Sequence, residues 1–273
     1  MNRARLFTHY SRAQRTRQRV SELPPDITVI LPTYNERDNI GPLIQRALAA
    51  LNGYQVEILV VDDDSPDGTW QVVTALVERD PRLRLIRRTG ERGLTSAIAT
   101  GINQSQGAWV GWMDGDLSMP PEDLPRLVSA LADGADMAVG SRYIPGGRDV
   151  GHAWVGRAFS RTINLAASLL LDRYIKDYTS GFILARRPVF DRVQLRGDYG
   201  EYCIDMLYRA LRAGYSVVEV PYHYMPRQSG QSKTATTPWG YVTRGWNYVI
   251  TIVRLRFDKP SQEGAGPFHK RSQ

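Results

Sequence analysis

The chain has 273 residues, 42% hydrophobic and 23% charged, a composition typical of one large globular domain or two small ones. Its formal net charge is +7, but residues 20–257 carry equal numbers of basic and acidic side chains. Most of the excess of basic side chains lies in an N-terminal arm, residues 1–25, which has six arginines before residue 20. The neutral body argues against a nucleic-acid partner, and the single cysteine, Cys203, excludes a disulfide framework and a cysteine-based zinc cluster.

The first half of the chain alternates short apolar runs with helical patterns. The apolar runs cover residues 27–32, 56–63, 83–88, 108–114 and 135–142. The helical patterns cover residues 38–51, 68–79, 93–105 and 121–132. The runs are continuously apolar and do not alternate in polarity, which is typical of strands buried on both faces. The sequence therefore predicts an α/β fold with a mostly parallel sheet and helices on both faces.

The second half has fewer strands and longer helices. Helical patterns cover residues 154–171 and 200–213, and strand patterns cover residues 180–187 and 215–226. A last amphipathic pattern, residues 238–257, places six apolar residues on one helical face: Trp239, Val242, Trp246, Val249, Val253 and Phe257. This stripe suits either docking on the protein's own core or contact with a membrane surface. No apolar stretch approaches the ~20 residues that span a bilayer.

Polar motifs follow four of the predicted strands. They are PTYNE (32–36), DDDSPDGT (62–69), DGD (114–116) and GSR (140–142). The carboxyl ends of parallel strands face one crevice, where ligands bind. Asp114 and Asp116 would repel each other there unless a cation offsets their charge, and oxygen ligands suit Mg²⁺ or Mn²⁺ held jointly with substrate phosphates. The alternative is that the two aspartates cap the helix that follows. We favour the metal site.

These motifs carry a family resemblance. In chain order they read ILPTYNE, VVDDDSPDGT, GL…A (93–97), MDGDLSMPPE, GSRY, DYTSGF and RQSGQSK. Seven motifs in this order resemble the family 2 glycosyltransferases, specifically the dolichol- or polyprenol-phosphate mannose synthases. The resemblance covers about residues 26–235 and implies a GT-A fold, with a nucleotide-sugar half (26–142) and an acceptor half (143–235), followed by the helix segment (236–258) and a tail (259–273).

The resemblance also implies an activity and site residues. The implied activity is inverting, metal-dependent transfer of mannose from GDP-mannose to dolichyl or polyprenyl phosphate. The implied nucleotide-sugar ligands are Pro32, Tyr34, Glu36, Val61, Asp63, Met113, Asp114, Gly115, Arg142, Arg227 and Lys233. The implied metal ligands for Mg²⁺ or Mn²⁺ are Asp116, Asp114 and Ser118. The implied acceptor-phosphate ligands are Arg142, Arg157, Ser160 and Arg227. The residues expected to matter most for catalysis are Asp116, Arg142, Arg227 and Lys233.

The chain departs from the family pattern near Ser160. Relatives have a basic residue four positions before the aligned serine, where this chain has Gly156 with Arg157 next to it. A phosphate acceptor is already anionic and needs no base, so the site must gather two anions with cations. A polysaccharide acceptor would instead need a base, for which Asp177 or Asp205 could serve, although Asp177 fits a structural role better.

Two further alternatives remain open at the level of sequence. One is the same reaction with another donor, such as UDP-glucose. The other is a non-catalytic protein that binds through its basic arm, which we expect to be disordered. For a lipid acceptor, we expect a cytoplasmic protein that lies peripherally on the cytoplasmic face of a membrane, with or without a membrane-anchoring partner subunit.

Overall fold

The structure, a computed structural model, describes residues 26–230 and 238–258, with side chains from residue 245 onward in the last helix. Lys233, the arm (1–25) and the tail (259–273) lie outside the described residues, as do the first two members of the predicted stripe, Trp239 and Val242, whose side chains are not described.

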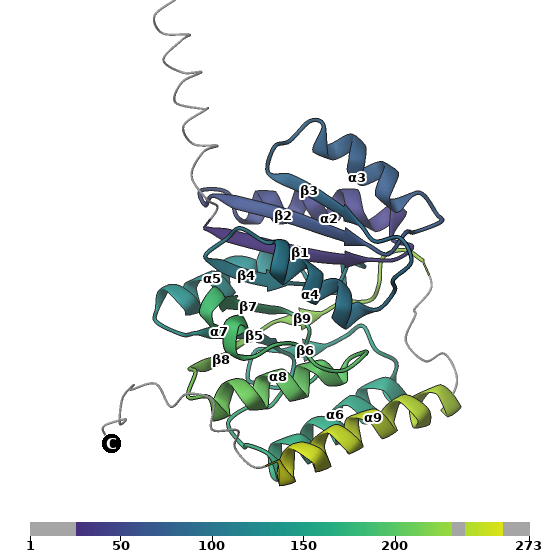
Figure 1. The fold of residues 1–273 in the computed structure, drawn as a ribbon. Coiled ribbons are helices and arrows are strands. Elements are labelled where there is room, and N and C mark those ends of the chain that lie inside the picture. Colours follow the sequence, from purple (N-terminus) through teal and green to yellow (C-terminus); the bar gives the residue numbers. More distant parts are fainter. Residues whose placement is uncertain (1–25, 231–237, 259–273) are drawn as a thin grey trace, which may run out of the picture.

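A seven-stranded sheet forms the centre of the protein (Figure 1). Its strands, in spatial order, are β3 (Leu83–Arg87), β2 (Val56–Asp62), β1 (Ile27–Thr33), β4 (Trp109–Trp112), β7 (Ile183–Arg186), β5 (Met137–Ser141) and β8 (Val217–Pro221). All neighbours are parallel except β7, which is antiparallel to both β4 and β5. The chain order reverses between β1 and β4, and this reversal creates the crevice in which open sheets bind ligands.

The helices cover both faces of this sheet, as predicted. One core joins the sheet to α2 (Arg37–Ala50), α3 (Thr69–Val77) and α5 (Leu124–Ala132), which follows a short 3-10 turn, η1 (Pro121–Asp123). The other core joins it to α4 (Leu94–Gln104), α6 (Trp154–Leu170), α7 (Arg187–Arg192), α8 (Glu201–Arg212) and α9 (Pro238–Phe257). β1, β2 and β5 are buried along their length, which explains why they read as continuous apolar runs, whereas the edge strand β3 is only partly buried.

Two features of the acceptor half were not predicted. The first is the antiparallel direction of β7, and Gly111 permits its close approach to β4, because a Cβ there would lie 2.2 Å from the carbonyl oxygen of Ile183. The second is a small parallel pair, β6 (Arg148–Asp149) with β9 (His223–Tyr224). The predicted strand 215–226 is thus two strands, and its second part leaves the main sheet to form one wall of the crevice.

The last helix settles how the amphipathic stripe is oriented. In α9, Tyr248, Ile252 and Leu255 pack on the protein, beside α6 and α8. The described members of the stripe, from Trp246 to Phe257, lie on the other side and are exposed. The helix therefore docks with one apolar face and leaves a second apolar face uncovered by any described residue. In Figure 1, α6 and α9 run side by side along one end of the molecule.

Candidate active site

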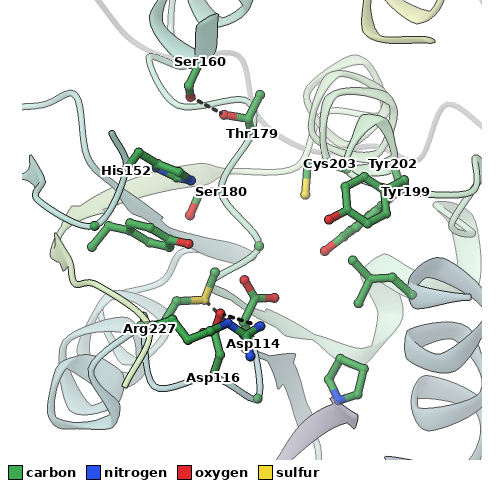
Figure 2. A pocket seen from close by; sticks show the side chains of 18 of the residues that line it. Asp114, Asp116, His152, Ser160, Thr179, Ser180, Tyr199, Tyr202, Cys203 and Arg227 are labelled. Carbon is green, nitrogen blue, oxygen red and sulfur yellow. Dashed lines mark hydrogen bonds and ion pairs between the residues drawn. The ribbon is translucent and has the colours of Figure 1, made fainter. Parts of the chain in front are cut away.

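A cavity of about 590 Å³ lies at the carboxyl ends of the strands and takes its walls from both halves of the chain. Figure 2 shows its two polar ends, with Asp114, Asp116 and Arg227 on one side and Ser160 and Thr179 on the other. The structure brings ten of the sequence-predicted residues together in its wall: Pro32, Tyr34, Glu36, Asp63, Asp114, Gly115, Asp116, Arg142, Ser160 and Arg227.

Strained turns position the strand-end motifs. Among the described residues, the non-glycine residues with positive φ are Asn35, Asp64 and Leu117, and each lies a few residues after β1, β2 or β4. Such conformations cost free energy and persist where the surroundings enforce them, often at functional sites. Here the enforcing contacts include the side chain of Asp62, which accepts hydrogen bonds from Thr33 Oγ1 at 2.9 Å and from the Ser65 backbone N–H at 2.8 Å.

Asp63 ties the end of β2 to the segment between β3 and α4. One carboxylate oxygen accepts a hydrogen bond from Arg88 Nε at 2.7 Å, and the other accepts one from the Gly93 N–H at 2.8 Å. Gly93 has φ 144°, a conformation that suits glycine. Arg88 Nη2 also lies 2.5 Å from the first of these oxygens, whereas the second, Oδ2, has a further lone pair for a ligand donor. Nearby, the Arg92 guanidinium lies 4.7 Å from the Tyr34 ring centroid, so an aromatic and a cationic group flank this end.

Three carboxylates crowd the other side of this end of the cavity. Arg227 Nη1 donates to Glu36 at 2.9 Å, and its Nη2 lies 3.1 Å from Asp116 Oδ2. Asp114 keeps some exposure to the cavity, yet burial, and next the charge of Asp116, raise its pKa to about 7. Among the described residues, the Arg227 guanidinium contacts two of these carboxylates, and the raised pKa of Asp114 shows that negative charge still accumulates there, which an added cation would relieve.

The donor set fits a hard divalent cation that a substrate helps to hold. Among the residues that the structure describes, no three histidine, cysteine, aspartate or glutamate side chains form a closed metal site. Asp114 and Asp116 offer carboxylate oxygens on an open wall, and Mg²⁺ is commonly held by one or two carboxylates together with substrate phosphates. Ser118, the third predicted ligand, is fully buried and does not line the cavity. Its backbone N–H instead donates to Asp116 Oδ1 at 3.0 Å and orients that carboxylate.

Arg142 anchors the opposite end of the cavity, near Ser160 and Thr179, through a buried ion pair. Its Nε and Nη2 each lie 2.8 Å from an oxygen of Asp177, a two-point contact between a fork and a carboxylate. Although burial disfavours the charged guanidinium, Asp177 holds the pKa of Arg142 above its usual range. Nη2 also donates to Thr179 Oγ1 at 2.8 Å, and Thr179 in turn contacts Ser160 Oγ at 3.2 Å. This end of the cavity is thus a connected network in which Arg142 contacts Asp177 and two hydroxyls and lies 3.7 Å from the carboxylate of Asp149.

Neither aspartate considered as a base for an alcohol acceptor is available at the cavity. Asp177 is fully buried and holds Arg142. Asp205 pairs with Arg209 and with Arg254 and is not part of the cavity wall. Both carboxylates hold structural elements in place.

The remaining predicted residues lie elsewhere. Val61 and Met113 are in the hydrophobic cores, directly before the strand-end motifs. Arg157 is not in the cavity wall, and its Nη1 lies 3.5 Å from the Asp149 carbonyl oxygen. Lys233 is outside the described residues. Gly156, the departure from the family pattern, lies in the wall and offers no side chain.

Several residues that line the cavity were not predicted as site residues from the sequence. His152, Tyr224 and Thr179 line the cavity, and His152 contacts Asp149 three residues earlier. The Asp-x-x-His spacing in RDVGH was the available signal. Cys203 also reaches the wall, where burial raises the pKa of its thiol to about 12, so the thiol stays neutral. This is the apolar role expected of a lone buried cysteine.

Comparison with known proteins gives consistent matches. The glycosyl transferase family 2 profile matches residues 28–194. A dolichol-phosphate mannosyltransferase of Pyrococcus furiosus is 40% identical over 210 residues, which are 76% of this chain and 58% of that protein. A polyprenol monophosphomannose synthase of Mycolicibacterium smegmatis is 42% identical over 75% of this chain and 79% of its own length. Among solved structures, glucosyl-3-phosphoglycerate synthase from Mycobacterium tuberculosis, with Mn²⁺, UDP and product, aligns with a TM-score of 0.63 at 20% identity, covering 89% of this chain and 83% of that one. This last likeness supports the GT-A fold.

Proposed function

The chain belongs to glycosyl transferase family 2, and we propose that this glycosyltransferase moves mannose from GDP-mannose to the phosphate of a polyprenol or dolichol. Two relatives at 40% and 42% identity are named for dolichol-phosphate and polyprenol-phosphate mannose synthesis. The observation that carries the proposal is a single cavity that joins a carboxylate-rich end to an arginine and hydroxyl end. Such a cavity suits two anionic substrates that meet in the middle.

At the donor end, the chain's own residues would orient the nucleotide sugar. The wall at Tyr34, Arg92 and Asp63 offers an aromatic face, a cation and carboxylate acceptors, which suit a nucleoside. Arg227 would exchange its contacts with Glu36 and Asp116 for the diphosphate. A bound Mg²⁺ or Mn²⁺, held by Asp116 with Asp114, would neutralise the diphosphate leaving group.

At the acceptor end, the residues would position a phosphate oxygen for direct attack on the sugar. A phosphate monoester carries about 1.5 to 2 negative charges at neutral pH, so no base has to deprotonate it. Arg142, fixed by Asp177, and the hydroxyls of Ser160 and Thr179 supply a rigid set of donors. Catalysis then rests on positioning and on the stabilisation of charge. Inversion follows from a single attack on the face opposite the leaving group.

The surface of α6 and α9 supports a peripheral position on a membrane. Exposed apolar side chains, which we call the α6–α9 face, lie on these neighbouring helices: Trp154, Val155, Leu165, Leu169, Leu170, Trp246, Val249, Ile250, Val253 and Phe257. A groove beside Leu165 and Leu169 is also lined by Arg161, Arg173 and Lys176. Apolar side chains rimmed by bases suit an interface with anionic lipids. No helix in the described part of the chain has both the length and the apolar character to span a bilayer.

The experiment that tests the proposal is transfer of radiolabelled sugar to a short polyprenyl phosphate. GDP-mannose and UDP-glucose are offered in parallel, each with Mg²⁺ and with a chelator. Label in the lipid phase from GDP-mannose alone, lost with the chelator, supports donor, acceptor and metal together. Label from UDP-glucose alone would replace the donor and keep the acceptor. The absence of transfer from either donor would contradict the proposal.

A further inference from the structure

His152 lies in the cavity wall without a role in the reaction described above. Its Nδ1 is 2.9 and 3.0 Å from the two carboxylate oxygens of Asp149, and its backbone N–H donates to the same carboxylate at 3.1 Å. Its ring stacks on Tyr224, with the centroids 4.5 Å apart and the planes 7° apart. Asp149 is only 2% exposed, whereas His152 keeps 30% of its side chain exposed. A buried carboxylate and an aromatic ring thus fix an imidazole whose other edge is accessible.

The hydrogen-bond chemistry of this pair decides what Nε2 can do. Because an ionised carboxylate only accepts hydrogen bonds, Nδ1 must carry the proton that it shares with Asp149. Nε2 has no hydrogen-bond partner among the side chains and backbone groups that the structure describes. In the neutral ring Nε2 would be an acceptor, and in the imidazolium it would be a donor. A phosphate oxygen can therefore bind Nε2 only when the ring is charged.

The charge balance at the acceptor end calls for such a cation. Arg142 lies 2.8 Å from Asp177 and 3.7 Å from Asp149, so two buried carboxylates share one buried guanidinium. These three buried groups together carry one negative charge, which would repel an incoming phosphate. A further guanidinium, that of Arg157, contacts the Asp149 carbonyl oxygen at 3.5 Å but lies outside the cavity wall. An imidazolium at His152 cancels that charge. Figure 2 shows His152 between Ser160 and Thr179 on one side and the Asp114–Asp116 pair on the other, which is where a phosphate must lie to reach the sugar.

We propose that His152, held by Asp149, binds the phosphate of the acceptor through Nε2 as an imidazolium, alongside Arg142 and Ser160. The inference rests on the proposed phosphate acceptor. For an alcohol acceptor, the same pair in its neutral form would be a general base. The two roles differ in kinetics. If His152 binds the phosphate, its loss raises the KM of the acceptor, and binding of the acceptor weakens as the pH rises. If His152 is a base, its loss lowers kcat, and kcat falls as the pH falls.

The test compares the wild type with His152→Ala and His152→Gln in mannosyl transfer from GDP-mannose to farnesyl phosphate. The expected result for His152→Ala is a KM for farnesyl phosphate raised about tenfold or more, the usual size of a lost charge-assisted hydrogen bond. The KM for GDP-mannose should stay within about twofold and kcat should change little by comparison, because the donor end is untouched. His223→Ala is the matched control, since His223 is exposed on β9 beside Tyr224 and outside the cavity wall.

The pH profile separates the two roles. As the pH rises, the wild-type KM for farnesyl phosphate should rise relative to that of His152→Gln, which cannot gain a charge. The second ionisation of the phosphate, at about pH 6, is common to both proteins and cancels in the ratio. The groups that face the ring, Asp149, Tyr224, Arg142 and Arg157, are also unchanged between the two. A fall in kcat at low pH that His152→Gln abolishes would overturn the proposal in favour of a base.

Equilibrium binding keeps this inference separable from the proposed function. Farnesyl phosphate and farnesol are titrated into the wild type and both variants in the presence of GDP and Mg²⁺. Loss of farnesyl phosphate binding in His152→Ala, with farnesol binding unchanged, supports the phosphate contact even if mannosyl transfer fails. Equal farnesyl phosphate affinity in wild type and variants would overturn it, as would a rise in the KM of the donor instead of the acceptor. A thermal melt of each variant identifies any that fails to fold. If one variant fails to fold, the other alone is enough to test the proposal.

Discussion

The donor and acceptor ends of the cavity handle charge in different ways. At the donor end, the Arg227 guanidinium contacts Glu36 and Asp116, and the charge of Asp116 helps to raise the pKa of Asp114, so the described carboxylates favour a cation that arrives with the substrate. At the acceptor end, Arg142 is enclosed by Asp177 and by a network of hydroxyls. The donor end is therefore built for exchange of ions and the acceptor end for rigidity. Charge changes should damage activity at the first end and stability at the second.

The largest effect is expected at Asp116. Asp116→Asn should lower kcat/KM for mannosyl transfer roughly a thousandfold, because the leaving diphosphate loses its main electrostatic support. The free energy of unfolding should change by less than about 1 kcal/mol, since the variant also removes repulsion with Asp114. Kinetics and urea denaturation measure the two quantities separately.

Asp133→Asn provides the matched control for that variant, because Asp133 is exposed at the end of α5 and should affect neither quantity. If Asp116→Asn instead unfolded the protein while the surviving fraction kept its activity, the contrast between the two ends would disappear.

The next effect tests the rigidity of the acceptor end. Asp177→Asn leaves the buried Arg142 with the more distant carboxylate of Asp149, and breaking a buried ion pair in this way should cost about 3 kcal/mol of unfolding free energy. Urea denaturation at neutral pH measures the loss. The equivalent change in an exposed pair, Asp80→Asn beside Arg82, should cost less than about 0.5 kcal/mol. Equal small losses in both variants would show that burial does not strengthen the Arg142–Asp177 pair.

The same contrast explains what could be predicted from the sequence. The nucleotide-sugar half (26–142) has parallel strands, of which β1 and β2 are buried along their whole length. Local apolar runs and the motifs that end them therefore predict both the strands and the wall of the cavity, as at Asp63 and Asp116. In the acceptor half, local pattern is a weaker guide. The direction of β7 depends on its neighbours β4 and β5, which are distant in sequence, and local patterns carry no information about this pairing.

His152 and the stripe on α9 illustrate what local pattern leaves open. His152 reaches the cavity because β6 pairs with β9, 75 residues later along the chain, and no spacing within RDVGH reveals that contact. The stripe from Trp246 to Phe257 was predicted as an apolar face, but an apolar face alone does not say what covers it. The structure shows that the stripe is not the docking face of α9, because the other side, with Tyr248 and Leu255, packs on the protein.

A smaller effect is expected at the α6–α9 face. Trp246 and Phe257 are 65% and 79% exposed. Replacing both by serine should lower binding to vesicles with anionic lipids about tenfold, because apolar area that would enter the interface is lost. The unfolding free energy should change by less than about 0.5 kcal/mol per substitution. Vesicle flotation measures the binding.

Tyr54→Ser, at an exposed aromatic residue of the donor half, is the matched control for this face and should bind vesicles as the wild type does. Equal loss in the control would mean that any exposed aromatic residue contributes. No loss in the double variant would remove the α6–α9 face as the membrane contact and leave the basic arm as the remaining candidate.

The smallest effect concerns the docking of α9 on α8. Arg254 Nη2 lies 2.8 Å from Asp205 Oδ1, but Arg254 is half exposed and Asp205 keeps its second partner, Arg209. Arg254→Ala should therefore lower the unfolding free energy by only about 1 kcal/mol, and added salt should reduce the difference. Arg256→Ala, exposed on the same helix, should change it by less than about 0.5 kcal/mol. If Arg254→Ala lowered the unfolding free energy by more than about 3 kcal/mol, the buried carboxylate of Asp205 would need both arginines. The docking of α9 would then depend on a buried ion pair, as the Arg142 network does.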